Sequence, residues 1–116
     1  MKNGIYPLRN FETDPYIDTF PGQETDNSRA FRANGIAPRS RFLSKDVQAT
    51  HAMIAAGLGV ALNNAILAYG LDLSDIITLP TDPPVEVEIG IAAPRKEDRS
   101  PAAEHFLKYA LDHLPD

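Results

Sequence analysis

The sequence contains no cysteine. This absence excludes a disulfide framework, catalysis by a thiolate and zinc sites with cysteine ligands. Basic residues are also few, because 11 lysines and arginines stand against 16 acidic residues and give a formal net charge of -5. No cluster of Lys or Arg offers a footprint for phosphate contacts, so we do not expect this chain to bind DNA or RNA by itself.

Long apolar runs are absent as well. The most apolar stretch, residues 52–68, is interrupted by Gly57, Gly59, Asn63 and Asn64 and does not reach the length of a membrane span. The N-terminal stretch MKNGIYPLRNFETD is polar and lacks the apolar region of a signal peptide. We therefore expect a cytoplasmic location and no membrane partner.

Residues suited to catalysis are sparse. His51, His105 and His113 are the only imidazoles, and none lies near a nucleophile motif or at metal-ligand spacing. Capping or solvent-facing roles account for them better. Glu86 and Glu88 resemble a carboxylate pair, but they alternate with apolar residues and fit the solvated face of a strand. We expect no enzyme, no metal and no cofactor.

The chain of 116 residues has room for one compact domain, organised around residues 45–65. An apolar stripe at helical spacing opens this stretch and includes Val47, Thr50, Ile54 and Leu58. Gly57 follows where a left-handed residue would end a helix, and residues 60–62 read as a buried strand. Because the Gly57-Leu58-Gly59 turn ends a helix and precedes a strand, it is not a phosphate-binding loop.

Strands and helices alternate along the rest of the chain. We expect strands at 15–20, 41–43, 76–79 and 85–91, the last half-buried with period two, and helices at 23–34, 65–69 (closed by Gly70) and 102–114. Candidate N-caps are Asp26, Asn27 or Ser28 for the first helix, Ser44 or Asp46 for the central one, and Ser100 before Pro101 for the last. Residues 1–14 read as an irregular lead-in. This order predicts an α/β fold with a mostly parallel sheet covered by helices on both faces.

Several segments together resemble one known family. PYIDTFPG, FRANGIAPRSRF, AMIAAGLGVALNNAILA, ITLPTDPPVEVEIGIAAP and SPAAEHFLKYAL occur in that order. In order and spacing they are similar to the effector-binding domain of LysR-type transcriptional regulators. The resemblance implies one lobe of a fold like that of type 2 periplasmic binding proteins, in which two α/β lobes enclose a ligand.

The resemblance also implies a domain organisation. Residues 1–14 would be a hinge segment and residues 15–116 a single regulatory lobe, within which 85–116 correspond to the returning segment and C-terminal helix. A DNA-binding helix-turn-helix domain and most of the first lobe would lie upstream of this piece. Because the last strand and helix would lack their usual partner, we expect them to fold back on the lobe or to swap with a second copy.

The loops at the carboxyl edge of the predicted sheet are the candidate ligand site. They follow successive strands at 19–23, at 44–46 and at Asn63 with Asn64, and such loops converge in a parallel sheet. The resemblance implies ligand contacts in the first two loops, which carry over to Thr19, Phe20, Pro21, Ser44 and Lys45. Asn63 and Asn64 replace the Leu-Pro common in the family and make the site more polar. Lys45 favours an anionic effector, because a cation beside a helix N-terminus is otherwise unfavourably placed.

Three functions follow from these features. The leading one is an effector-sensing, dimer-forming regulatory domain that acts on DNA only through an absent N-terminal domain. A lobe of a solute-binding protein for uptake is the second, and a small homodimeric interaction module is the third.

Overall fold

Parallel strand pairing sets the architecture of the computed structural model, which describes residues 4–68 and 71–114. Strands β2 (Tyr16–Thr19) and β3 (Ser40–Ser44) pair in parallel, with Ile17 opposite Phe42 and Thr19 opposite Ser44. A second parallel pair joins β1 (Tyr6–Pro7) to β4 (Thr81–Asp82). The expected parallel α/β fold is confirmed, although its described strands form two small sheets.

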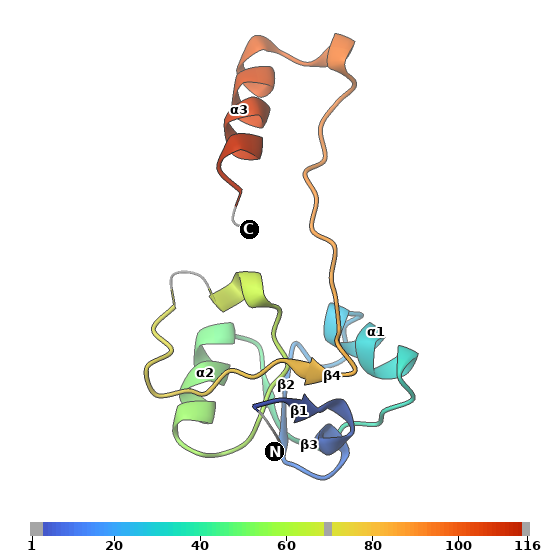
Figure 1. Ribbon diagram of the computed structural model, residues 1–116, viewed down its shortest axis with the longest axis vertical. Helices are drawn as coiled ribbons and strands as arrows, with labels where there is room; N and C mark the ends of the chain where they lie inside the picture. Colours follow the sequence, from blue (N-terminus) through green and yellow to red (C-terminus); the bar gives the residue numbers. More distant parts are fainter. Residues whose placement is uncertain (1–3, 69–70, 115–116) are drawn as a thin grey trace.

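Helices cover both sides of β2. Helix α1 (Asp26–Ala33) meets the Tyr16 ring through Phe31, with ring centroids 5.3 Å apart. Helix α2 (Val47–Ala55) is joined to the other side of β2 by a hydrogen bond between the Thr19 and Thr50 hydroxyls. Figure 1 shows β2 between these two helices. The predicted covering of both faces is therefore present.

Capping residues determine where the helices begin and end. Asp46 caps α2, and Ser100 caps α3 (Pro101–Asp112), as expected. The cap of α1 is Thr25, one residue before the predicted candidates, because its hydroxyl and that of Ser28 form a reciprocal capping box. Gly57 ends α2 with φ of 81°, and the Leu58 amide donates to the Met53 carbonyl at 3.1 Å. This is a Schellman motif, which satisfies carbonyls at the helix end.

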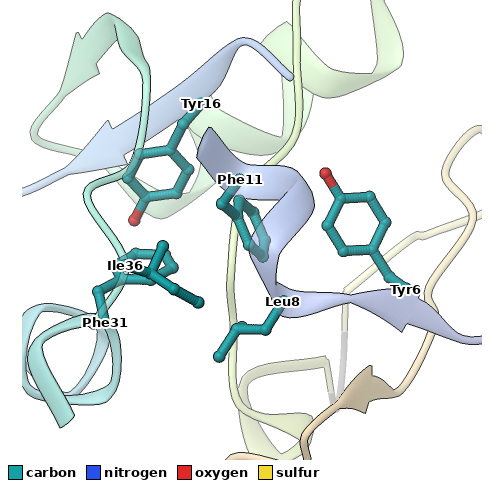
Figure 2. Packing of buried hydrophobic residues seen from close by; sticks show 6 residues of the cluster. All are labelled: Tyr6, Leu8, Phe11, Tyr16, Phe31 and Ile36. Atoms are coloured by element: carbon teal, nitrogen blue, oxygen red, sulfur yellow. The ribbon is translucent and has the colours of Figure 1, made fainter. Parts of the chain in front are cut away.

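The core is an aromatic cluster (Figure 2). The Phe11 ring lies 4.9 Å from Tyr6, 5.5 Å from Tyr16 and 5.3 Å from Phe31, measured between centroids. Leu8 is completely buried in the same cluster. Edge-to-face and tilted aromatic contacts of this kind add to the free energy of burial.

The N-terminal segment therefore contributes to the core, and the expectation of an irregular lead-in is wrong for residues 6–12. Tyr6 lies in β1, and Leu8 and Phe11 lie in the 3₁₀ helix η1 (Leu8–Glu12). Glycine and proline interrupt the sequence here, but three large apolar side chains at short spacing are enough to anchor it.

Three predicted strands do not form at their expected positions in the described residues. Residues 60–62 contribute one isolated parallel bridge, between Val60 and Tyr16. The strand expected at 76–79 is displaced to β4, beyond Pro80, whose carbonyl accepts from the Tyr6 amide at 2.9 Å. Residues 85–91 have no strand partner among the described residues. The alternation of apolar and polar residues identified an extended segment, but it did not identify the neighbouring strand with which that segment must pair.

Two further segments complete the chain. The brief helix expected at 65–69 is the 3₁₀ helix η2 (Ala65–Ala68), while Tyr69 and Gly70 lie outside the described residues. A third 3₁₀ helix, η3 (Lys96–Asp98), precedes α3. No helix in the described part of the chain is long and apolar enough to cross a membrane.

Helix α3 stands apart from the rest of the molecule, at the end of a long extended segment (Figure 1). None of its residues is buried, and the Phe106 side chain is 68% exposed. Of the two outcomes expected for the C-terminal helix, folding back on its own lobe is wrong, and exchange with a second copy stays a prediction. The 18 residues between β4 and α3, 83–100, have no strand partner in the described structure and lead α3 away from the body.

Gly59 is predicted to be intolerant of a side chain. A Cβ atom at this position would lie 2.4 Å from the Pro15 carbonyl oxygen, which also accepts from the Val60 amide at 2.9 Å. We expect Gly59→Ala to lower the free energy of unfolding by about 1–3 kcal/mol in urea denaturation, as overpacking does. Gly90→Ala is the matched control, because a Cβ there meets nothing within 4 Å. Equal stability of both variants would contradict the close approach.

Burial raises the pKa of the Tyr16 phenol to about 12, and the nearby Asp18 charge adds to the effect. The folded state therefore holds this proton more tightly than the unfolded state does. Stability is unaffected below pH 10 and falls as the pH rises from about 10 to 12, by up to about 3 kcal/mol. Urea denaturation at pH 8 to 11.5 should show this loss, and Tyr16→Phe should reduce it. An equally steep loss in the variant would assign it to other groups.

Candidate functional site

The carboxyl ends of β2 and β3 meet at one edge of the molecule. The Phe20 amide donates to the Ser44 carbonyl at 2.7 Å, and Thr19 lies opposite Ser44 in the parallel register. Pro21 and Lys45 follow directly in the two loops. The structure thus brings together five of the six residues expected to bind a ligand.

Phe20 has an unusual backbone. Its φ of 61° lies in the left-handed region, which non-glycine residues with bulky side chains rarely occupy. Its side chain is 38% exposed at the sheet edge. Strained residues of this kind cluster at binding sites, where the surrounding structure holds them in place. The turn therefore presents an aromatic ring to solvent in a fixed position.

Ser44 and Lys45 lie at the start of α2. The Ser44 hydroxyl donates to the Asp46 carbonyl at 2.9 Å and accepts from the Asp46 amide at 3.2 Å. The Asp46 carboxylate accepts from the Gln48 amide at 3.0 Å, so it is occupied as the helix cap. Lys45 is exposed, and no carboxylate in residues 4–68 or 71–114 forms an ion pair with it. Its ammonium group is open to a ligand.

The Thr19 hydroxyl is hydrogen-bonded to α2 through Thr50. Thr50, which is 1% exposed, donates from its hydroxyl to the Asp46 carbonyl at 3.0 Å. Since a hydroxyl has one proton, Thr19 must donate in the 2.9 Å bond between the two threonines. Only the lone pairs of Thr19 remain for a ligand. The sequence predicted Thr50 only as a residue of the apolar helix stripe. The signal for its hydrogen bond with Thr19 was its position one turn after the cap residue Asp46.

Asn63 lies farther along the same edge. Its amide nitrogen is 2.9 Å from His51 Nε2, in the second turn of α2. The Asn27 side chain also donates to the Leu62 carbonyl at 2.7 Å and ties this loop to α1. Asn63 is therefore connected to the other candidates through α2 rather than by direct contact. His51 is half-buried and supports Asn63, a role that the sequence did not indicate.

Half-buried Asp18 lies one residue before the site. Burial raises the pKa of its carboxyl group above the ordinary value. The cause is that the half-buried carboxylate loses part of its hydration, which penalises the charged form.

The candidate residues form an open edge and not a closed pocket. One hollow of about 270 Å³ lies between α2 and residues 71–76, and another of about 440 Å³ lies between α1 and residues 84–88. None of the six expected ligand-binding residues lines either hollow. In the part of the chain that the structure describes, no group of three or more His, Asp or Glu residues could hold a metal ion.

The sequence of the chain matches a known protein family. Residues 21–115, most of the chain, match the family described as LysR substrate binding domain. The chain belongs to the LysR substrate binding domain family. Membership in this family implies a fold like that of type 2 periplasmic binding proteins. The LysR resemblance expected from the ordered segments is confirmed.

One curated relative is substantially longer. The chain is 27% identical over 106 residues to the uncharacterized HTH-type transcriptional regulator YvbU of Bacillus subtilis (strain 168). The alignment covers 90% of this chain and 36% of that relative. The chain therefore spans about a third of the length of the relative.

The threonine pair provides a test of how the edge is built. Thr50→Val keeps the shape of the side chain but leaves the Thr19 hydroxyl without its acceptor. We expect a loss of about 1–3 kcal/mol in the free energy of unfolding, the usual cost of an unpaired polar group. Replacing both threonines by valine should cost less than the sum of the single changes in urea denaturation, because neither hydroxyl is then unpaired. Strictly additive losses would contradict the bond.

Proposed function

We propose that this chain is the effector-sensing part of a LysR-type transcriptional regulator. A small molecule binds at the loops that end β2 and β3, in a cleft that a first lobe completes. Its ligand contacts come from Thr19, Phe20, Pro21, Ser44, Lys45 and Asn63. The observation that carries this proposal is the 2.7 Å bond between Phe20 and Ser44, which joins the two loops in a chain of the LysR family.

The effector is a small anion, such as a carboxylate. Lys45 supplies a cation without a partner among the described residues, and the first turn of α2 adds the positive end of a helix dipole. The Phe20 ring offers an apolar surface beside this charge. A carboxylate on a short apolar skeleton matches both features, and a hydroxyl or amino group on the same skeleton supplies the donor that the Thr19 oxygen can accept.

Binding of the effector controls DNA binding by a helix-turn-helix domain that this chain does not include. The name of the longer relative, an HTH-type transcriptional regulator, supports this part of the proposal. In the same proposal the protein acts in the cytoplasm, without catalysis, and associates with itself. Residues 1–14 form the hinge segment, 15–116 the regulatory lobe, and 85–116 within it the part that returns toward the first lobe.

Binding of small carboxylates should raise the melting temperature of the chain. A ligand at ten times its Kd stabilises the folded state by about 1.4 kcal/mol, or about 6 °C for a domain of this size. A panel of aliphatic and aromatic carboxylates, titrated to tens of millimolar in thermal denaturation, allows for weak binding by an open edge. Lys45→Gln should abolish any shift, because it removes the cation but keeps a flexible polar side chain.

Lys96→Gln is the control for general charge effects, since Lys96 lies in η3, far along the chain from the site. A shift that persists in Lys45→Gln, or disappears equally in Lys96→Gln, would contradict the proposed site. No shift with any carboxylate would argue against an anionic effector.

A further inference from the structure

Asn63 and His51 form a polar pair at the end of the sheet where the candidate ligand loops lie. The Asn63 amide nitrogen is 2.9 Å from His51 Nε2. Asn63 is exposed and His51 is half-buried, so the asparagine side of the pair is open to solvent. The bridge between Tyr16 and Val60 is parallel, and Thr19 and Asn63 follow these two residues at equal separations in sequence. The parallel direction therefore brings Asn63 to the same sheet edge as Thr19.

The atoms in this contact determine where the imidazole carries its proton. An amide nitrogen donates hydrogen bonds and does not accept them, so His51 Nε2 is the acceptor. In the neutral ring the proton then lies on Nδ1. At the other end of the Asn63 amide, Oδ1 has no hydrogen-bond partner among residues 4–68 and 71–114. This oxygen is the part of Asn63 that is left for a ligand, and it only accepts.

Acceptors of this kind select a ligand that carries a donor. The Thr19 oxygen is also restricted to accepting, because its proton is donated to Thr50. Lys45 and the first turn of α2 supply positive charge for a carboxylate. An ammonium group has three N–H donors and no acceptor, so it matches the two acceptor oxygens. A carbonyl oxygen in the same place would leave all of these oxygens unpaired.

We propose that the effector is a 2-amino carboxylate and that His51 is the positioning residue that selects it. This inference rests on the proposed function of the same edge. The carboxylate binds beside Lys45, and the ammonium group donates to Thr19 Oγ1 and Asn63 Oδ1. Neutral His51 holds the Asn63 amide in the orientation that this ammonium group requires.

Protonation of His51 weakens this selection. An imidazole ordinarily gains its second ring proton as the pH falls from 8 to 5, and both ring nitrogens then donate. The exposed Asn63 amide must turn over so that its Oδ1 accepts from Nε2. Its NH2 group then takes the outer position. A donor in that position suits the carbonyl oxygen of a 2-oxo carboxylate better than an ammonium group.

The charged groups around His51 are mainly carboxylates. Asp72 and Asp75 line the hollow of about 270 Å³ that His51 also lines, and the other lining residues are uncharged. Before α2, Lys45 and Asp46 contribute one charge of each sign, more than one helical turn from His51. The imidazolium form therefore meets no net repulsion at this position.

The tautomer of His51 tests the inference without a ligand. Long-range proton–nitrogen NMR spectra of the nitrogen-15-labelled chain at pH 7.5 should show a bare Nε2 and a protonated Nδ1. The His51 signals are identified as those that the variant His51→Gln removes. A proton on Nε2 would overturn the inference, because the Asn63 amide would then direct its oxygen to the ring and its nitrogen to the ligand.

Two matched acids test the selection itself. The compounds 2-aminobutyrate and 2-oxobutyrate share one carbon skeleton, and neither changes its charge between pH 5.5 and 7.5. Chemical-shift titrations of the chain give the Kd of each, even where binding is weak. We expect 2-aminobutyrate to bind more tightly at pH 7.5. Its advantage over 2-oxobutyrate should fall about tenfold at pH 5.5, which is the effect of one hydrogen bond.

The variant Asn63→Leu separates the amide from the charge of His51. It keeps the imidazole but has no amide to turn over, so its ratio of Kd values should not change with pH. His51→Gln should also remove the pH dependence, whereas His105→Gln, at an exposed position of α3, should retain it.

A pH-dependent ratio in Asn63→Leu would overturn the inference, because the charge alone would then explain the effect. Binding of both acids with a constant ratio in the unmodified chain would overturn the inference and leave the proposed function intact. No binding of any carboxylate would contradict both.

Discussion

The Phe11 ring holds the body of this molecule together. It contacts the rings of Tyr6, Tyr16 and Phe31, and so joins the N-terminal segment, β2 and α1 in one cluster. The position of β1 in turn sets the position of β4, since the Tyr6 amide bonds to the Pro80 carbonyl. The direction in which residues 85–114 leave the body thus depends on an aromatic contact made by residues near the other end of the chain.

Features with local causes were predictable from the sequence, and features with distant partners were not. The caps Asp46 and Ser100 and the glycine at the end of α2 act within one helical turn, so the residues themselves reveal them. A strand needs a neighbour that the sequence does not name. Residues 85–91 have the alternation of a strand but no partner in the described structure, whereas Tyr6 and Pro7 have little alternation but pair with β4.

The same distinction applies to the candidate site. That the loops after β2 and β3 converge follows from parallel pairing alone, so their position could be predicted. The bond from Thr19 to Thr50 could not, because 31 residues separate the two hydroxyls and Thr50 also fits an ordinary helix stripe. Such a contact changes the chemistry of the site, since it leaves Thr19 able to accept a hydrogen bond but not to donate one.

Apolar side chains are buried in the core of the body, whereas none in residues 86–114 is fully buried. Aromatic side chains in the body bury one another, and no buried side-chain nitrogen or oxygen in its described part lacks a partner. Val85 packs against the core and Val87 lines a hollow beside α1, but the chain path beyond them keeps the apolar side chains of residues 89–114 away from the body. Glu86 and Glu88 are exposed and keep the other face of residues 85–91 hydrated. Because the buried residues of the core cluster all lie between Tyr6 and Ile36, the edge formed by β2 and β3 keeps its shape without contacts from residues 89–114.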